Sequence, residues 1–336
     1  MKVVVDAFGG DHAPGEIVKG VVAAVERQGI TAVLTGDRQA LERLFAQQRW
    51  SDRGIELVDA SEVIGMEEEP VAAVRQKKNS SLVVAMRLLA DGAADAFVGA
   101  SSTGAMLTAA VLIVRRIRGV LRPALAPVLP SRGAPFLLID AGANAECRAE
   151  QLEQFGLMGS LYMEQVFGVA SPRVGLLNIG AEPHKGTALQ IEAYARLQAA
   201  GLNFVGNLEG TDALAGRCDV LVADGYAGNI FLKSAEGAAA MFTGLLRELF
   251  QSGLSARAAA ALIASPLKQR LRQIDSRTYG GTALLGISKP VIKAHGSSDA
   301  TAIENAIGQA RRFHESGMTR RLEEALAAKS PPADPA

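Results

Sequence analysis

The sequence predicts an α/β fold with a mostly parallel sheet and helices on both faces. Two observations lead to this class: β-branched apolar runs alternate with amphipathic stretches, and polar, glycine-rich segments follow where the apolar runs end. Repeated βα units produce this alternation. Because ligands bind beyond the carboxyl ends of the strands in open α/β sheets, the glycine-rich segments should converge on one crevice.

The expected elements alternate along nearly the whole chain. Strands are predicted at residues 3–5, 32–35, 55–58, 94–98, 125–129, 136–139, 174–177, 204–205, 220–222, 284–287 and 291–294. Helices are predicted at residues 16–27, 37–48, 82–90, 105–115, 149–166, after 186, 230–250, 255–273 and after 299. The polar run 79–81 can cap the helix at 82–90, and Asp299 can cap a long last helix.

The length of the chain bears on its domain organisation. A chain of 336 residues exceeds the size at which one hydrophobic core usually stops growing. We therefore expect residues 1–328 to form a single α/β catalytic unit, or two closely joined lobes. A helical hairpin is expected to project near residues 250–275, and the Ala/Pro-rich tail at 329–336 is expected to be disordered.

Composition excludes several classes of function. Lysine and arginine (35) balance aspartate and glutamate (35), so the formal charge is zero, which argues against nucleic acid as a partner. Cys147 and Cys218 stand apart from any metal-binding spacing, which indicates a reducing cytoplasm and no structural metal. The short apolar run at the N-terminus is interrupted by Asp6, so it does not have the pattern of a signal peptide. The uncharged stretch 96–114 approaches the length of a membrane span, but the polar residues at 99–104 favour a strand, a loop and a helix.

The first glycine-rich segment follows the first strand. Gly9 and Gly10 allow the backbone to adopt positive φ and to approach an anion, and Pro14 can open the next helix. The segment is either one wall of an anion site or a tight βα turn without a ligand. Asp6 and Asp11 would repel phosphate, so we expect them to fix the loop and neighbouring cations.

Other segments carry donors for an anion. Ser102, Thr103 and Gly104 would open the helix at 105–115, where backbone N–H groups and hydroxyls can bind an oxyanion; ordinary capping is the alternative. Lys185 and Lys233 are either compact charges near the crevice or solvated surface lysines.

His295 precedes another candidate helix start. It is either a donor to a ligand or a buried, hydrogen-bonded histidine. The sequence contains no G-x-S-x-G, H-E-x-x-H or Walker motif, so covalent serine catalysis and ATP use lack support. A crevice with many anion donors and no obvious nucleophile suits a substrate that brings its own nucleophile.

Several segments together resemble the bacterial phosphate acyltransferase family. They are residues 6–14, 69–70, 103–105, 140 with 142–144, 176–180 with 185–186, 224–225 with 228–229, 279–281 and 293–298. They span the chain from Met1 to about Gly308 in the same order as in the family, and so many motifs in register are specific.

The resemblance implies an activity and partners. An acyl group would pass from acyl carrier protein to inorganic phosphate, and the acyl-phosphate would serve the first acylation of glycerol 3-phosphate by a membrane acyltransferase in phospholipid synthesis. The resemblance also implies no cofactor, a homodimer, and a cytoplasmic location with possible peripheral contact at the inner face of the cell membrane. The implied fold is similar to the isocitrate/isopropylmalate dehydrogenase and phosphotransacetylase group.

Carried onto this sequence, the resemblance implies Lys185, Asn229 and His295 as catalytic residues. Phosphate would attack the thioester carbonyl directly, with Asn229 among the groups that stabilise the oxyanion. The implied substrate-binding residues are Asp6, Gly9, Gly10, Asp11, Ser102, Thr103, Gly104, Asn144, Asn178, Asp224, Lys233 and Ser297.

The chain departs from the family at a few positions. Ser101 and Ser102 stand where the family usually has Gly-Asn before Thr-Gly, so a role for that asparagine amide does not carry over. Phe8 replaces a usual methionine and Ala181 a usual acid.

The region after residue 250 combines apolar and basic residues. Leu254 and Leu262 would touch the membrane surface, while Lys268, Arg270 and Arg272 would offer cations to the acidic carrier protein. Packing in a dimer interface is the alternative for this region.

Three rival functions stay open. The first is acyl transfer from CoA, and the second is a non-catalytic scaffold for the carrier protein or the membrane. The third, a nicotinamide dehydrogenase of the isopropylmalate type, is disfavoured because the sequence contains neither a dinucleotide fingerprint nor an evident metal-binding aspartate cluster.

Overall fold

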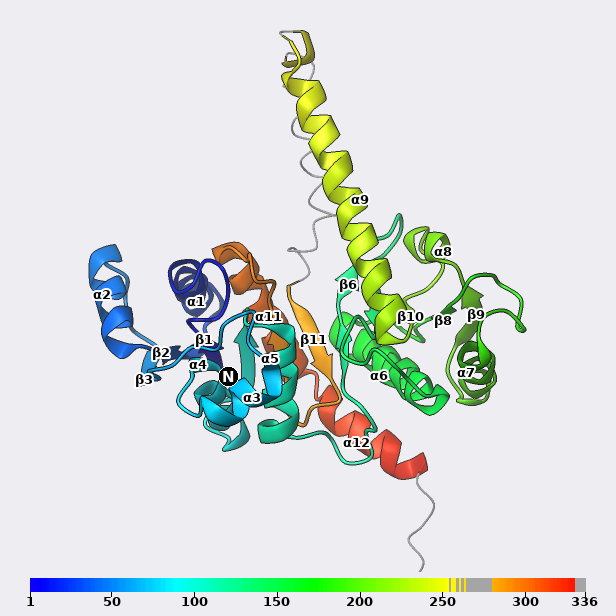
Figure 1. The fold of residues 1–336 in the computed structure, drawn as a ribbon, viewed down its shortest axis with the longest axis horizontal. Helices are drawn as coiled ribbons and strands as arrows, with labels where there is room; N and C mark the ends of the chain where they lie inside the picture. Colours follow the sequence, from blue (N-terminus) through cyan, green and yellow to red (C-terminus); the bar gives the residue numbers. More distant parts are fainter. Residues whose placement is uncertain (254, 258–259, 261–262, 264–279, 330–336) are drawn as a thin grey trace, which may run out of the picture.

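The computed structural model describes residues 1–253, 255–257, 260, 263 and 280–329. Two sheets with their helices lie side by side, and one long helix projects away from both (Figure 1). The expected hairpin falls largely outside the described residues, as do most of the predicted helix at 255–273 and the tail at 330–336. The same holds for the five positions assigned to membrane or carrier-protein contact: Leu254, Leu262, Lys268, Arg270 and Arg272.

Among the described residues, the first sheet has the strand order β3-β2-β1-β4-β12-β11-β5. Its strands are β1 Lys2–Asp6, β2 Thr31–Gly36, β3 Ile55–Asp59, β4 Ala96–Gly99, β5 Ala124–Ala126, β11 Thr282–Leu285 and β12 Val291–Lys293. All neighbours are parallel except β11, which runs antiparallel to β12 and β5. The carboxyl ends of β1, β4 and β12 therefore meet at one edge.

The second sheet has the order β6-β7-β10-β8-β9 over the part of the chain that the structure describes. Its strands are β6 Val128–Leu129, β7 Phe136–Ile139, β8 Val174–Leu177, β9 Phe204–Leu208 and β10 Val220–Val222. Only β6 is antiparallel to its neighbour. The expected class, a mostly parallel α/β fold, is confirmed, with its strands divided between two sheets.

Helices connect the strands and cover the sheets. Their bounds are α1 Gly15–Gln28, α2 Arg38–Gln48, α3 Pro70–Gln76, α4 Ser81–Ala90, α5 Thr103–Ala109, α6 Ala149–Phe167, α7 Ala188–Ala199, α8 Gly210–Leu214, α9 Gly225–Gln251, α11 Ala300–Glu315 and α12 Met318–Lys329. A π-helical turn, η1 Ala110–Val114, continues α5. None of the described helices is both long and apolar enough to cross a membrane.

Two sequence predictions were wrong in detail. The expected single strand at 125–129 is split between β5 and β6, which belong to different sheets, and Pro127 lies between them. Proline has no N–H for a ladder hydrogen bond, which suits a strand break. The expected long last helix is two helices, because Gly317 at φ 65° ends the run between α11 and α12.

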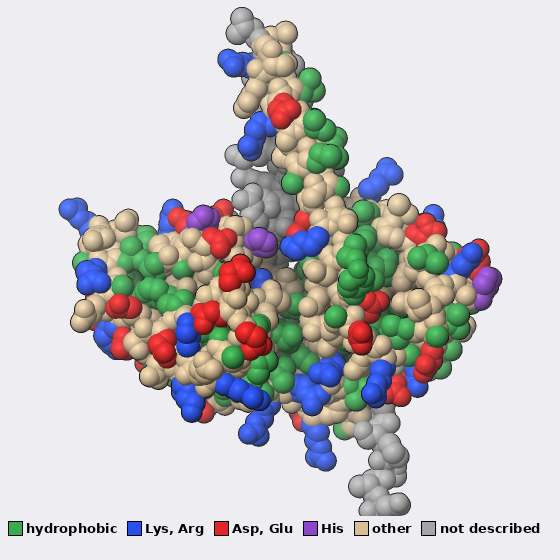
Figure 2. Space-filling model, viewed as in Figure 1, with side chains coloured by type: hydrophobic (Ala, Val, Ile, Leu, Met, Phe, Trp, Pro, Cys, Tyr) green, Lys and Arg blue, Asp and Glu red, His purple; other side chains and the backbone are tan. Residues whose placement is uncertain are grey.

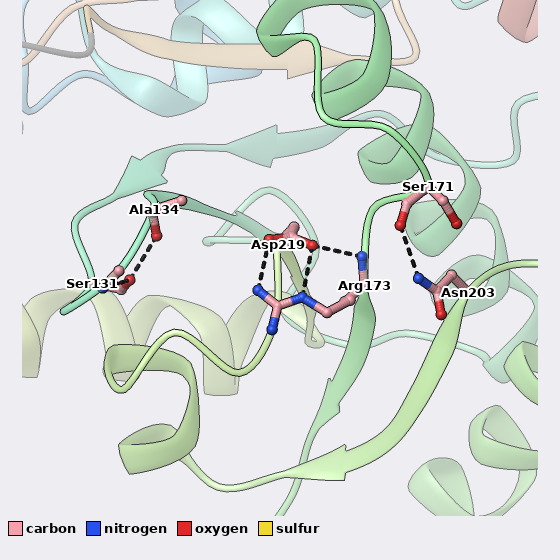
Figure 3. A network of polar contacts seen from close by, with 7 residues as sticks. Ser131, Ala134, Ser171, Arg173, Asn203 and Asp219 are labelled. Atoms are coloured by element: carbon pink, nitrogen blue, oxygen red, sulfur yellow. Dashed lines mark hydrogen bonds and ion pairs between the residues drawn. The ribbon is translucent and has the colours of Figure 1, made fainter.

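A charged contact joins β8 and β10 at their amino ends (Figure 3). Nε and Nη2 of the Arg173 guanidinium donate to the Asp219 carboxylate at 3.0 Å and 2.9 Å, and the Arg173 backbone N donates at 2.8 Å. Asp219 is 8% exposed. Although burial alone would raise the pKa of Asp219, the bonds and charge of Arg173 outweigh it and hold the pKa below its ordinary value. The contact fixes the second sheet at the end opposite its polar tips.

Replacing Asp219 by Asn is expected to lower the free energy of unfolding at pH 7 by roughly 1–3 kcal/mol, because the amide cannot satisfy three donors as the carboxylate does. The folded-state pKa of Asp219 is depressed. The extra free energy of unfolding of the wild type over the variant is therefore present above the unfolded-state pKa and disappears as the pH falls through the folded-state pKa. Urea unfolding at several pH values measures it. Glu192→Gln, at an exposed pair with Arg196, is the control and should stay within about 0.5 kcal/mol. An unchanged Asp219→Asn protein at pH 7 would contradict the argument.

Candidate active site

A pocket of about 400 Å³ lies where the strand ends of the first sheet face the start of α9. The tips after β4 and β12 and the first turns of α9 contribute polar groups, and the segment from β5 to β6 contributes apolar ones. The lining residues are Thr103, Leu125, Pro127, Val128, Leu129, Ala141, Gly142, Asn229, Leu232, Lys233, Glu236, Gly280, Gly281, Thr282, Lys293, Ala294, His295, Ser298 and Ala302. The pocket therefore brings together segments from most of the length of the chain.

The tips of the first sheet pack against one another. Asp11 N donates to the Gly296 carbonyl at 2.8 Å. Gly10 adopts φ 109°, and a Cβ there would lie 2.9 Å from the Ala100 Cβ and 3.0 Å from the Gly296 oxygen. Only glycine combines this conformation with this approach. The opening loop is thus fixed against the segments that carry Thr103 and His295.

Asp6 fixes the same opening loop through its side chain. Its buried carboxylate accepts the hydroxyl of Ser101 and the backbone N–H of Phe8, the latter at 3.2 Å. Burial raises the pKa of Asp6, and the hydrogen bonds from Ser101 and the loop oppose that rise. A Cβ at Gly9 would collide with both Ser101 and Asp6. These contacts support a loop-fixing role for Asp6.

Asp140 is the corresponding anchor between the two sheets. Its carboxylate is fully buried and accepts from the backbone N of Leu125 at 2.9 Å, of Ala143 at 3.1 Å and of Asn144 at 2.7 Å. Burial raises the pKa of Asp140, and these hydrogen bonds oppose it. At Gly228 an added Cβ would meet the Asp140 carbonyl oxygen, so α9 begins in contact with this loop.

The ring of His295 has a defined orientation. The backbone N of Ser297 donates to Nδ1 at 3.3 Å, and the Ser297 hydroxyl lies 2.9 Å from the same nitrogen. Because a backbone N–H can only donate, Nδ1 is the acceptor and Nε2 carries the proton of the neutral ring. His295 can therefore offer an Nε2–H donor to an anion in the pocket.

The pocket contains two lysines and one glutamate. Lys233 Nζ pairs with Glu236 at 2.9 Å on the first turns of α9. Lys293, at the end of β12, is half-buried. Its pKa is lowered first by burial and then by the charge of Lys233, with Glu236 opposing. The excess of positive charge favours an anionic ligand.

The sequence-predicted site residues separate into groups. The pocket is lined by Thr103, Asn229, Lys233 and His295. Ser102, Gly104 and Ser297 are chain neighbours of lining residues, and Ser102 stands at the N-cap of α5 without a side-chain capping bond. The groups around Asp6 and Asp140 support the pocket from outside.

Asn144 and Asp224 are engaged within the protein. The Asn144 amide donates to the Pro123 carbonyl at 2.8 Å and to Asp140 at 3.0 Å. Asp224 accepts the Ala227 N–H at 2.9 Å and caps α9. Both residues therefore position the segments that line the pocket.

Lys185 lies in the loop after β8 and does not line the pocket. Asn178 donates to the Lys185 carbonyl at 3.0 Å, and Asn207 donates to the Glu182 carbonyl at 2.8 Å. These bonds hold the loop in shape from the side of the second sheet. Lys185 and Asn178 thus belong to one hydrogen-bonded loop, and neither of them lines the pocket.

Lys293, Glu236 and Ser298 line the pocket but were not assigned a site role from the sequence, although Lys293 and Ser298 fall within the family-like segment 293–298. Lys293 directly precedes the Ala294-His295 pair at a strand end, which was an available signal. Glu236 lies one helical turn after Lys233, and only the direction of α9 brings it to the pocket. Within the described residues, no group of three His, Cys, Asp or Glu side chains is arranged to hold a metal ion.

Solved structures with the same fold include acyl-transferring enzymes. A phosphotransacetylase from Streptococcus pyogenes superposes with a TM-score of 0.64 at 19% identity, over 93% of this chain and 94% of the other. The EutD phosphotransacetylase from Staphylococcus aureus gives a TM-score of 0.60 at 17% identity, over 93% and 94% of the two chains. A 4-hydroxythreonine-4-phosphate dehydrogenase from Salmonella typhimurium gives 0.54 at 15% identity, over 93% and 99%. At these identities the likeness shows the fold alone, and that fold matches the expected group.

Sequence relatives define the family. A family model described as fatty acid synthesis protein matches residues 1–321. A phosphate acyltransferase of Caldanaerobacter subterraneus subsp. tengcongensis is 45% identical over 327 residues, 97% of each chain. One from Bacillus licheniformis is 45% identical over 332 residues, covering 98% of this chain and 99% of the relative. The chain belongs to the phosphate acyltransferase family, as the sequence motifs indicated, and is an acyltransferase.

Replacing Gly228 by Ala should lower the free energy of unfolding by about 1–3 kcal/mol, because the new Cβ would press on the Asp140 carbonyl oxygen. The start of α9 would move, and Asn229 and Lys233 with it, so acyl transfer should also slow. Gly237→Ala on the same helix is the control. No described atom outside its helix lies within 4 Å of that Cβ, and helix propensity favours alanine by about 1 kcal/mol. Urea unfolding compares the two, and equal stability would count against the contact.

Proposed function

We propose that the chain transfers the acyl group of an acyl carrier protein thioester to inorganic phosphate, which yields acyl-phosphate. One observation carries the proposal: the pocket joins Lys233, Lys293 and an oriented His295 to an apolar wall. Cations and N–H donors suit phosphate. Membership of the phosphate acyltransferase family supports the reaction class.

The apolar wall suits the acyl group of the donor. It is formed by Leu125, Val128, Leu129 and Leu232, from β5, β6 and α9. Apolar area removed from water stabilises a bound chain by roughly 0.8 kcal/mol for each buried CH₂. The polar groups come from the strand ends of the first sheet and from the first turns of α9, so the pocket offers polar donors for phosphate beside apolar area for the acyl group.

The proposed reaction is a direct substitution at the thioester carbonyl. A phosphate oxygen forms a bond to the carbonyl carbon, and the carbonyl electrons move to its oxygen. When they return, the C–S bond breaks and its electron pair leaves on sulfur. The proton of hydrogen phosphate finishes on that thiolate, so acyl-phosphate and the carrier thiol are formed without a further reactant.

Donors in the pocket would stabilise the tetrahedral oxyanion. Asn229 and the Nε2–H of His295 are the candidates among the lining residues, with the Thr103 hydroxyl beside them. One such donor is worth about 10²–10³ in rate. Lys185 belongs to the proposal as a catalytic cation from the second sheet, held by the loop that Asn178 organises.

The proposed partners follow from the reaction. Acyl carrier protein is the donor, and acyl-phosphate would be consumed by a membrane acyltransferase that acylates glycerol 3-phosphate in phospholipid synthesis. The proposal includes a cytoplasmic location with peripheral contact at the inner face of the cell membrane. The family description, fatty acid synthesis protein, supports this setting.

The test is formation of acyl-phosphate, trapped as its hydroxamate, from acyl carrier protein thioester and phosphate without added metal. Turnover with this donor and not with acyl-CoA supports the proposal. A preference for acyl-CoA would favour a CoA-dependent enzyme, and binding of the carrier protein without phosphate consumption would favour a scaffold.

In the same assay, Lys185→Ala should bind the acyl donor normally and form acyl-phosphate at least 10-fold more slowly. Unchanged turnover at saturating phosphate would remove Lys185 from the mechanism.

Helix α9 presents an apolar stripe away from the body of the protein (Figure 2). The stripe consists of Met241, Phe242, Leu245 and Leu249, which are 65%, 61%, 56% and 59% exposed. An exposed apolar stripe of this kind marks an interaction surface. We assign it to the homodimer, and assign Leu254 and Leu262 beyond it to membrane contact.

Replacing Leu245 by Glu should shift the sedimentation of the protein from dimer to monomer, because a charge would be buried in the interface. Thr243→Glu, two residues away on the other face of α9, is the control and should leave the dimer intact. Liposome flotation of both variants distinguishes a dimer surface from a membrane-binding surface. Loss of flotation with an unchanged dimer would mean that the stripe contacts the membrane instead.

A further inference from the structure

Lys293 ends β12 at the edge where the strand tips meet. It pairs with Gly99 of the parallel strand β4 on one side and with Thr282 of β11 on the other. By strand alternation its side chain shares the face of Val291, which belongs to a buried apolar cluster with residues of β1, β4, α4 and α5. The Lys293 side chain therefore lies at the end of this buried face, where it lines the pocket.

The ammonium group of Lys293 has unused hydrogen-bonding capacity. Its Nζ donates to the Ala294 carbonyl at 3.3 Å. A lysine has three N–H donors, and among the described residues no carboxylate lies within ion-pair distance of this one. Lys233, in contrast, already forms an ion pair with Glu236 at 2.9 Å. Lys293 is thus the half-buried cation of the pocket that a ligand can still pair.

The surroundings of Lys293 make a bound anion favourable. Burial and the charge of Lys233 lower its pKa, and Glu236 opposes this. His295, the other titratable group at this strand end, accepts the Ser297 N–H at Nδ1 and so directs Nε2–H away from that bond. An anion placed between these groups would offset both the burial of the ammonium and its repulsion by Lys233.

We propose that Lys293 is the direct ligand of the acceptor phosphate in this pocket, an inference that rests on the proposed function and adds a binding residue to it. The Lys293 ammonium donates to the phosphate oxygens opposite Thr103 and His295. Phosphate thereby lies at the end of β12, and the apolar lining residues remain for the acyl chain.

The test is Lys293→Met assayed with inorganic phosphate and acyl donor. The KM for phosphate should rise about 10–100-fold, the value of a charge-assisted hydrogen bond, while the KM for the acyl donor stays within twofold. Lys293→Arg should restore most of the phosphate affinity. Lys289→Met removes the same charge from the segment before β12, outside the pocket, and should leave both constants unchanged.

A pH profile separates ligation from a structural role. In the wild type, phosphate binding should weaken as the pH rises through the depressed pKa of Lys293, because the neutral amine no longer attracts the anion. Lys293→Arg should lack this step, since arginine stays charged. If the KM for phosphate in Lys293→Met equals that of the wild type, the proposal is overturned.

Thermal melting with inorganic phosphate alone distinguishes this proposal from the proposed function. Phosphate should raise the Tm of the wild type and not that of Lys293→Met, which should melt no lower than wild type without phosphate because a half-buried charge has been removed. Equal phosphate stabilisation of both proteins would overturn the ligand assignment even in an active enzyme. Phosphate stabilisation that depends on Lys293, without acyl-phosphate formation, would uphold the ligand and overturn the reaction.

Discussion

The buried carboxylate of Asp140 is the contact on which the arrangement of the site depends. It accepts the N–H of Leu125 from an edge strand of the first sheet, while Asp140 itself directly follows β7 of the second. The start of α9 packs on the same group, since a Cβ at Gly225 or Gly228 would meet Asp140 atoms. A buried carboxylate without these donors would be strongly unfavourable. The two sheets and α9 are therefore fixed together, and the pocket lies among them.

The pocket combines charge and apolar surface because strand ends, the β5–β6 segment and α9 meet there. The end of β12 and the segment after it contribute Lys293 and His295, while β5, β6 and Leu232 of α9 contribute the apolar wall. Acyl transfer between a thioester and phosphate needs both surfaces at one place. The same fold is found in phosphotransacetylases and in a dehydrogenase, so the chemistry resides in the side chains at the strand ends and not in the sheets themselves.

Local sequence patterns determined most of the elements. Alternation and capping residues such as Ser80 and Asp299 act through neighbours within a few residues, so the helices α4 and α11 begin where the sequence indicates. The convergence of the first-sheet tips also followed from parallel strand order. By contrast, the separation of β5 and β6 at Pro127 depends on which sheet each half joins, and that choice is made by distant strands.

The candidate site was predictable in part for the same reason. The sequence by itself singled out Thr103, Asn229, Lys233 and His295, because glycine-rich strand ends and family motifs are local features. Only the tertiary structure added Lys293 and Glu236, and placed Lys185 in a separate loop. Whether a lysine is solvated or half-buried beside another charge is decided by how the end of β12 and the start of α9 come together at the pocket. Sequence determined which groups are present, and the packing of two sheets decided which of them share a pocket.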